Sequence, residues 1–180
     1  MNADFQQAAP CVGQVFALPP CAPGPPPQGQ IRLHIDSFLG RGQFGTVYKC
    51  KTTSGSEPVA LKWMPSVHAS HFPKLAREVA VLARVGRHVN IVGLLTSWGS
   101  VQQRSLAIVL EYCGGGDLKD YLAQRCQEGR GLPEDTARDF GRQVARGMAF
   151  IWSKGCVHRS VGLPRRHLTA LAAAGLVVRI

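Results

Sequence analysis

The chain has 180 residues, 45% of them hydrophobic, which is sufficient for one domain with a packed core. Its formal net charge is +10, but no recognition motif or interleaved aromatic residues accompany the basic side chains, so we expect no nucleic-acid binding. The six cysteines lack C-x-x-C spacing, which argues against a metal site and a disulfide framework. No apolar run reaches the roughly 18 residues that span a bilayer, and no signal peptide is present. The sequence therefore predicts a cytoplasmic chain without a membrane segment.

Residues 1–30 contain more than half of the 12 prolines of the chain. Such a composition does not build a packed core and favours polyproline II structure. We therefore predict a disordered proline-rich leader over residues 1–30. Two overlapping P-x-x-P patterns, at Pro20–Pro23 and Pro23–Pro26, match SH3 ligands, but no arginine nearby completes such a ligand. A plain flexible leader is the alternative.

Three strand-like runs follow the leader and predict an antiparallel meander. They cover Ile31–Leu39, Gly45–Lys51 and Val59–Met64, with a serine-glycine turn between the second and the third. Helical periodicity then extends from Pro73 to Gly86, because apolar residues recur on one face and the terminal glycine can end a helix. The order strand, strand, strand, helix indicates a mixed α and β domain.

Two further strands are predicted at Ile91–Trp98 and Ser105–Tyr112, which brings the expected sheet to five strands. A glycine run follows, and Asp117 is the expected N-cap of a helix over Leu118–Arg125. The longest helical segment is Leu132–Ser153, with a proline in its first turn. Its apolar face carries Phe140, Val144, Gly147, Met148 and Ile151.

Three glycines at G-x-G-x-x-G spacing, Gly40, Gly42 and Gly45, separate the first two predicted strands. Without a Cβ at these positions, a hairpin backbone can approach a polyphosphate closely. One strand later Lys62 stands in a Val-Ala-Leu-Lys context, where its cation can hold the α- and β-phosphates. A Rossmann turn has the same glycine spacing but requires an amphipathic helix next, whereas a strand follows here. An ordinary glycine hairpin is the remaining alternative.

The paired glycine and lysine motifs resemble the nucleotide-binding lobe of a protein kinase. The resemblance implies an α+β fold: a kinase small lobe, which is a five-stranded antiparallel sheet plus one helix, followed by an incomplete, mainly helical start of the large lobe. It divides the chain after the leader into a small lobe with hinge at 31–113 and a partial large lobe at 114–159. Residues 160–180 form an unrelated tail in this division.

The resemblance also assigns an ATP site to particular residues. Glu78, in the first predicted helix, would pair with Lys62, and the alternative for this glutamate is a solvated helix charge. The main chain of Glu111 and Cys113 would bind adenine at the hinge, with Leu110 in the gatekeeper position. The residues that would enclose the nucleotide, for which ordinary strand core is the alternative, are Leu39, Phe44, Val47 and Ala60.

Four blocks resemble more narrowly the receptor tyrosine kinases of the fibroblast-growth-factor and platelet-derived-growth-factor types. These blocks are Gly86–Leu95, Glu111–Leu122, Gln143–Phe150 and Cys156–Arg159. The resemblance implies an ATP-binding tyrosine kinase domain, and a membrane receptor is one option for the parent of a longer form.

The resemblance ends abruptly after Arg159. The general base of the kinase catalytic loop would fall on Ser160, whose neutral hydroxyl cannot accept a proton at neutral pH. The asparagine that binds Mg²⁺ in the family would fall near Arg165, and no D-F-G follows. We therefore expect no intact catalytic residue and no protein ligand for the Mg²⁺ that the family uses. The tail reads as an unrelated frame or a retained intron, and a tail that packs as a new element is the alternative.

These features predict a fragment of an ATP-binding protein (tyrosine) kinase domain that does not catalyse phosphoryl transfer. Two alternatives stay open: a pseudokinase-like interaction module that regulates an intact kinase, and a splice or gene-model product with no function. An intact kinase or a chaperone is an expected partner, because the apolar face of the longest helix would lack its large-lobe neighbours.

Overall fold

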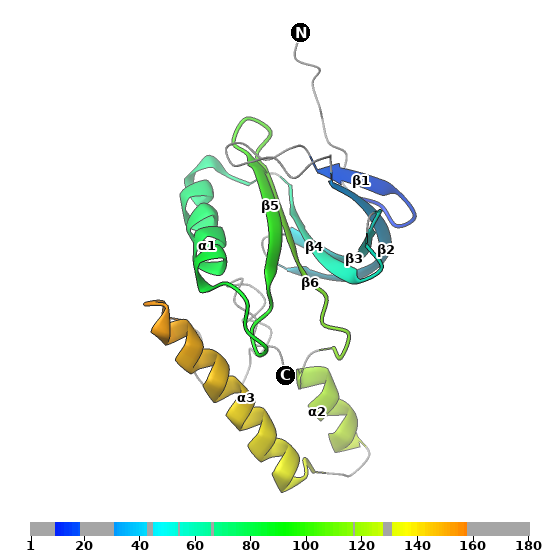
Figure 1. Ribbon diagram of the computed structural model, residues 1–180. Coiled ribbons are helices and arrows are strands. Elements are labelled where there is room, and N and C mark those ends of the chain that lie inside the picture. Colours follow the sequence, from blue (N-terminus) through cyan, green and yellow to red (C-terminus); the bar gives the residue numbers. More distant parts are fainter. Residues whose placement is uncertain are drawn as a thin grey trace. The chain divides into compact units, whose positions relative to one another are not determined.

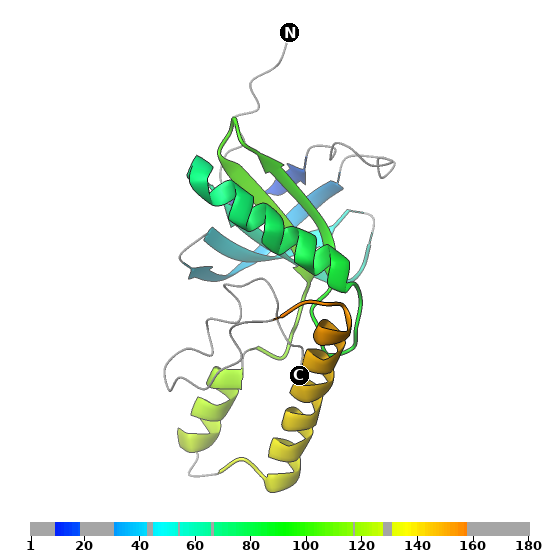
Figure 2. The same ribbon diagram turned by 90° about the vertical axis from the view of Figure 1, so that its left-hand side faces the viewer.

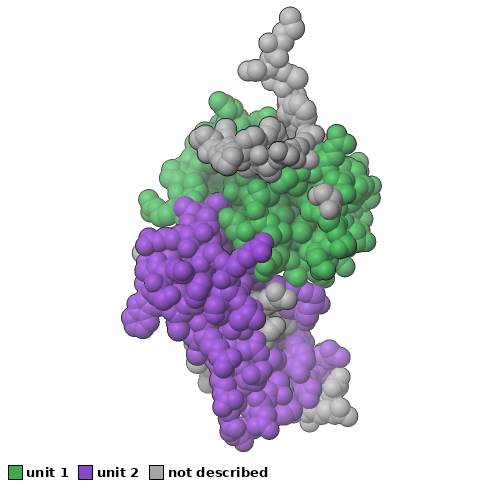
Figure 3. Space-filling model, viewed as in Figure 1, with its two compact units in different colours: residues 1–77, 94–112 green, residues 78–93, 113–180 purple. Residues whose placement is uncertain are grey.

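The computed structural model describes residues 10–18, 31–42, 45–53, 55–65, 67–116, 118–127 and 131–157. They form two compact units, one of residues 1–77 with 94–112 and one of residues 78–93 with 113–180 (Figure 3). The strands are β1 Val15–Leu18, β2 Ile31–Gly42, β3 Gly45–Thr52, β4 Pro58–Met64, β5 Leu94–Ser100 and β6 Ser105–Glu111. The helices are η1 Ala69–His71, α1 Phe72–Val85, α2 Leu118–Gln127 and α3 Glu134–Ser153.

The first unit is built on a curled antiparallel sheet of six strands in the order β1-β2-β3-β4-β6-β5 (Figures 1 and 2). The central strand β4 shows why the sheet has a closed face. Its residues alternate between half-buried and buried as far as Trp63, and Val59, Leu61 and Trp63 are 4%, 0% and 2% exposed. Side chains at every second position of a strand point to the same face, so these three residues lie on one side of the sheet. They belong to the main hydrophobic core, which gathers side chains from β1 to β4 and from β6.

Strand β1 corrects the prediction of a disordered leader over residues 1–30. Val15–Leu18 pairs with β2, and Phe16 and Leu18 are 6% and 2% exposed in the core. The Phe16 ring meets the Trp63 ring edge to face, with centroids 5.1 Å apart. The sheet consequently has six strands instead of five. The strand was not predicted because the leader as a whole is rich in proline, although the short apolar stretch Val-Phe-Ala-Leu within it contains none.

The predicted α+β fold, an antiparallel sheet with one helix followed by a mainly helical segment, is confirmed, and most element boundaries differ from the predictions by only a few residues. The predicted strand Ile91–Trp98 is the main exception, since β5 begins only at Leu94. Ile91 instead forms an isolated bridge with His88. Helix α3 begins at Glu134, and Pro133 is its N-cap, not part of its first turn. The predicted N-cap Asp117 lies outside the described residues.

In the second unit, the loop before β5 is attached to α3. The Nδ2 of Asn90, a residue only 5% exposed, donates a hydrogen bond of 3.1 Å to Oε1 of Gln143. Nε2 of Gln143 donates in turn to Asp139 at 2.8 Å. The His88 ring stacks on the Phe150 ring with centroids 4.5 Å apart. These contacts fix the loop by one hydrogen-bonded side chain and one aromatic pair.

The predicted apolar face of α3 is better covered than expected. Ile151 is 1% exposed and Gly147 is also buried, whereas Val144 and Met148 are half-buried. The half-buried Phe140 has the ring of Tyr121 of α2 at 6.0 Å. The expectation of a face without neighbours is therefore wrong at the end of α3 that holds Ile151.

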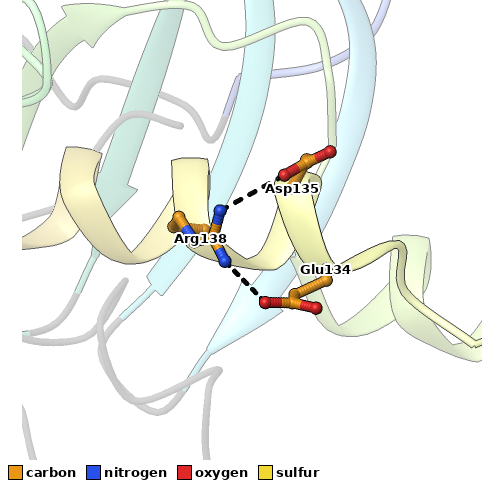
Figure 4. A network of polar contacts seen from close by, with 3 residues as sticks. All are labelled: Glu134, Asp135 and Arg138. Carbon is orange, nitrogen blue, oxygen red and sulfur yellow. Dashed lines mark hydrogen bonds and ion pairs between the residues drawn. The ribbon is translucent and has the colours of Figure 1, made fainter.

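The start of α3 carries two ion pairs (Figure 4). Arg138 contacts Glu134 at 2.5 Å and Asp135 at 3.4 Å, one helical turn earlier. The acidic residues in the first turn also suit the positive end of the helix dipole. Because all three side chains are largely exposed, each pair contributes only a few tenths of a kcal/mol. We regard this cluster as local helix stabilisation.

The buried strand β1 leads to a testable prediction about stability. Phe16→Ala should lower the free energy of unfolding by about 3–5 kcal/mol, because a buried ring that touches Trp63 is removed. Its neighbour Val15 is 49% exposed, so Val15→Ala is the matched control and should stay within about 0.5 kcal/mol of wild type. Urea denaturation followed by tryptophan fluorescence measures both. Equal small effects of the two variants would show that β1 does not contribute to the core.

Candidate functional site

The face of the sheet opposite to the main core brings several of the predicted site residues together. In the middle strand β4, Lys62 pairs with Val47 of β3 and Ile108 of β6, and Ala60 forms the neighbouring row. Directly opposed residues of antiparallel strands point to the same face, as do residues two apart along one strand. The residues that share this face include Val47, Lys49, Ala60, Lys62, Ile108 and Leu110.

This face is closed at Ile108, which is 4% exposed, but around Lys62 it is more open than the core face. Val47, Ala60, Lys62 and Leu110 are half-buried, whereas Leu61 on the core face is fully buried. An apolar surface that also carries the lysine Lys62 is suited to a ligand that has an apolar ring and an anionic group. Strand core was the alternative role for Val47 and Ala60, and their partial exposure shows that the hydrophobic core does not enclose them.

The glycine hairpin between β2 and β3 contains two kinds of glycine. Gly45 has a φ of 155°, and a Cβ there would collide with the carbonyl oxygen of Trp63 and lie 2.7 Å from Cγ of Met64. The fold itself therefore requires this glycine. A Cβ at Gly40 or Gly42 would meet no atom within 4 Å, so packing of the described residues does not explain these two glycines.

Leu39, which was predicted to cover a bound adenine, is 45% exposed on β2 beside the hairpin. A large apolar side chain exposed next to the glycines is available to a ligand. Phe44, predicted at the tip of the hairpin, lies outside the described residues together with Gln43.

The predicted hinge begins where β6 ends. Glu111 is the last residue of β6 and pairs with Val59 of β4, and Tyr112 and Cys113 follow it without regular structure. Both Glu111 and Cys113 are half-buried. Main-chain carbonyl and amide groups of such an extended stretch are of the kind that can hydrogen-bond to a ligand. The glycine run 114–116 ends with Gly116 at a φ of 77°, a value that favours glycine.

Glu78 occupies the middle of α1, and its position bears on its predicted role. Leu75 and Leu82 are each 4% exposed, and positions i, i+3 and i+7 of a helix share one face. Glu78 therefore lies on the buried side of α1 and is itself half-buried, which does not suit a fully solvated helix charge. Glu78 and Lys62 belong to different units, so their pairing stays a prediction.

The free cysteines of the described residues differ in environment. Cys50 is fully buried in the core, and this burial raises the pKa of its thiol to about 12. Its thiol therefore stays protonated at neutral pH and is not a nucleophile. Cys113 at the hinge is half-buried and Cys11 is exposed.

Other predicted features fall outside the described residues. His158, Arg159, Ser160 and Arg165 are among them, so the loss of the catalytic base stays a prediction from the sequence. Within the described ranges, no group of three His, Cys, Asp or Glu side chains is placed to hold a metal ion. No helix in this part of the chain is long and apolar enough to cross a bilayer.

Lys49 and Ile108 are residues of the site face that sequence reasoning missed. Lys49 stands two positions after Val47 on β3 and pairs with Ala60. Period-two alternation from Val47 would have placed it on this face, but no motif marked it.

Comparison with known proteins supports the assignment of the sheet and its motifs. Residues 33–161 match the protein kinase domain family. The chain is 33% identical to a fibroblast growth factor receptor of Hydra vulgaris over 153 residues, 76% of this chain and 18% of that protein. It is 33% identical to Wee1-like protein kinase 2 of Xenopus tropicalis over 125 residues, 68% of this chain and 22% of that protein. It is 35% identical to the serine/threonine-protein kinase unc-51 of Caenorhabditis elegans over 128 residues, 69% of this chain and 14% of that protein.

The chain spans less than a quarter of the length of each of these three relatives. Their names cover different kinds of kinase, so the narrower resemblance to receptor tyrosine kinases is one option among several. The kinase family matches most of the described sheet and helices. This match includes the glycine hairpin and the Val-Ala-Leu-Lys strand, which carry the residues of the candidate site. The chain belongs to the protein kinase domain family.

Proposed function

We propose that this chain binds ATP on the sheet face that carries Lys62 and that it does not catalyse phosphoryl transfer. The observation that carries the proposal is the register of β3, β4 and β6. It places Lys62 in one row and the small Ala60 in the next row of the same face. A cation and an apolar floor side by side match the two chemical halves of a nucleotide.

In this proposal the adenine ring lies against Val47, Ala60 and Leu110, which are half-buried and apolar. The main-chain carbonyl of Glu111 and the main-chain amide of Cys113 form its hydrogen bonds. Hydrogen bonds from these main-chain groups to adenine require extended backbone at the end of β6. This segment has no helix or turn before the glycine run.

The phosphates lie under the glycine hairpin. The open space at Gly40 and Gly42 lets the hairpin amides approach the phosphate oxygens, and Lys62 adds a charge-assisted contact. Glu78 is proposed to hold the Lys62 ammonium in position, as the resemblance to kinases implies.

The absence of turnover is proposed from the sequence. Ser160 stands where the family has its general base, and no D-F-G follows. Bound Mg²⁺ would supply charge neutralisation on the transferring phosphoryl group. The sequence does not supply the expected ligands of this ion, because Arg165 falls near the position of the metal-binding asparagine. The residues present can therefore bind and orient a nucleotide but supply neither a base nor a metal site.

Tyrosine specificity and a receptor parent are narrower proposals. They rest on the sequence blocks that resemble receptor tyrosine kinases and on the similarity to the Hydra receptor. A pseudokinase-like module that regulates an intact kinase is the second candidate function. It is favoured by Trp152 near the end of α3, which is 77% exposed and offers the kind of aromatic anchor common in protein interfaces.

Calorimetric titration with ATP tests the proposal. We expect a Kd weaker than about 1 μM, because the proposed phosphate contacts are one lysine, Lys62, and main-chain amides. Lys62→Ala should abolish binding. Lys51→Ala is the matched control, because it removes a lysine of β3 that has no role in the proposed site. The Lys51 side chain is 56% exposed and contacts Asp36 at 3.4 Å. Robust phosphorylation of a tyrosine peptide that depends on Lys62 would contradict the absence of turnover.

A pair of glycine variants separates the structural role of the hairpin from its binding role. Gly45→Ala should destabilise the fold by about 1–3 kcal/mol, because its φ and its contact with Trp63 exclude a side chain. Gly40→Ala should leave the melting temperature within about 1 °C of wild type, since its Cβ meets nothing. It should nevertheless weaken ATP binding several-fold. If Gly40→Ala binds ATP as wild type does, the hairpin does not approach the phosphates.

A further inference from the structure

A second lysine on the site face makes a contact that the kinase motifs do not assign. Nζ of Lys49 lies 5.0 Å from the centroid of the Tyr112 ring. Both residues are half-buried, and both belong to the first unit. An ammonium within about 6 Å of an aromatic centroid is attracted to the negative face of the ring.

The contact connects β3 with the residue that follows β6, and these two strands are not neighbours in the sheet. Lys49 is on β3 and Tyr112 directly follows β6, while β4 lies between these strands. Adjacent strands are about 4.8 Å apart, so β3 and β6 are separated by roughly 10 Å. To reach Tyr112, the lysine side chain has to pass over β4, where its direct partner is the small residue Ala60. The long apolar stem of lysine is suited to lie along such a surface.

The two ends of this contact belong to the two parts of the proposed adenine site. At one end Lys49 is two residues from Val47, on the strand that continues from the glycine hairpin. At the other end Tyr112 stands between Glu111 and Cys113, whose main chain is proposed to bind adenine. The contact therefore restrains the hairpin strand and the hinge relative to each other.

We propose that Lys49 is a positioning residue of the nucleotide site, which through its contact with Tyr112 fixes the spacing between β3 and the hinge segment 111–113. This inference rests on the proposed ATP binding and adds a residue to it. Lys62 holds the phosphates, whereas Lys49 acts on the adenine end through the hinge. Loss of Lys49 should therefore weaken the binding of adenosine and the binding of ATP by the same factor.

The test compares four variants by titration with adenosine and with ATP. Lys49→Met removes the charge and keeps most of the stem, and Tyr112→Leu removes the ring. Tyr112→Phe keeps the aromatic face and should behave as wild type. Lys51→Met is the matched control, because it removes the same charge two residues further along β3. We expect the Kd for both ligands to rise about 2- to 5-fold in Lys49→Met and in Tyr112→Leu. We expect no change in Lys51→Met.

A double variant and a ligand-free measurement distinguish positioning from a general loss of stability. In the Lys49→Met/Tyr112→Leu protein the two effects should not add, because they remove the same contact. Amide hydrogen exchange of residues 111–113 without ligand should accelerate in both single variants and stay unchanged in Lys51→Met.

The outcomes separate this inference from the proposed function. If wild type binds adenosine and Lys49→Met binds it equally well, the positioning role is overturned while ATP binding stands. Unchanged exchange at 111–113 would overturn it as well. If wild type binds neither adenosine nor ATP, the proposed function itself fails and the positioning role with it.

Discussion

The alternation of side chains along β4 is the constraint on which the rest of the site depends. Burial of Leu61 and Trp63 in the main core fixes which face of the strand points inward. Ala60 and Lys62 are then forced to the opposite face, because successive residues of a strand point in opposite directions. A slip of one residue would exchange the two sets and bury the lysine in the core. The position of the proposed phosphate-binding cation is thus a consequence of hydrophobic packing on the other side of the sheet.

Trp63 links this packing to the glycine hairpin and to β1. Its ring is covered by Phe16 on one side and stacks at 6.4 Å with Trp98 of β5. Its carbonyl oxygen occupies the space that a Cβ at Gly45 would need. One residue therefore anchors the core and brings the hairpin close to the end of β4. The hairpin glycines that lack such a structural reason, Gly40 and Gly42, are the ones proposed to face the phosphates.

Much of the fold could be predicted because local patterns agreed with tertiary packing. The alternation in Val59–Met64 and the helical periodicity of Pro73–Gly86 correspond closely to β4 and α1. Strand β1 was missed because proline-rich composition dominated its surroundings. The start of β5 was placed too early because Ile91 and Val92 are buried in a loop, at 1% and 4% exposure, and a short apolar run does not distinguish a strand from a buried loop. Of the site, the motifs predicted Lys62 and the glycines, but the contact of Lys49 with Tyr112 depends on strand order, which no local pattern contains.

Methyl NMR during titration with ATP most directly tests the central claim that one face of the sheet forms the core and the opposite face binds the nucleotide. Methyl signals of Val47, Ala60 and Leu110 should shift as ATP is added, because these residues share the face with Lys62. The methyl signals of Leu61 and Val109, at neighbouring positions of the same strands but on the core face, should stay unchanged. Shifts of equal size on both faces, or shifts confined to the core face, would contradict the account.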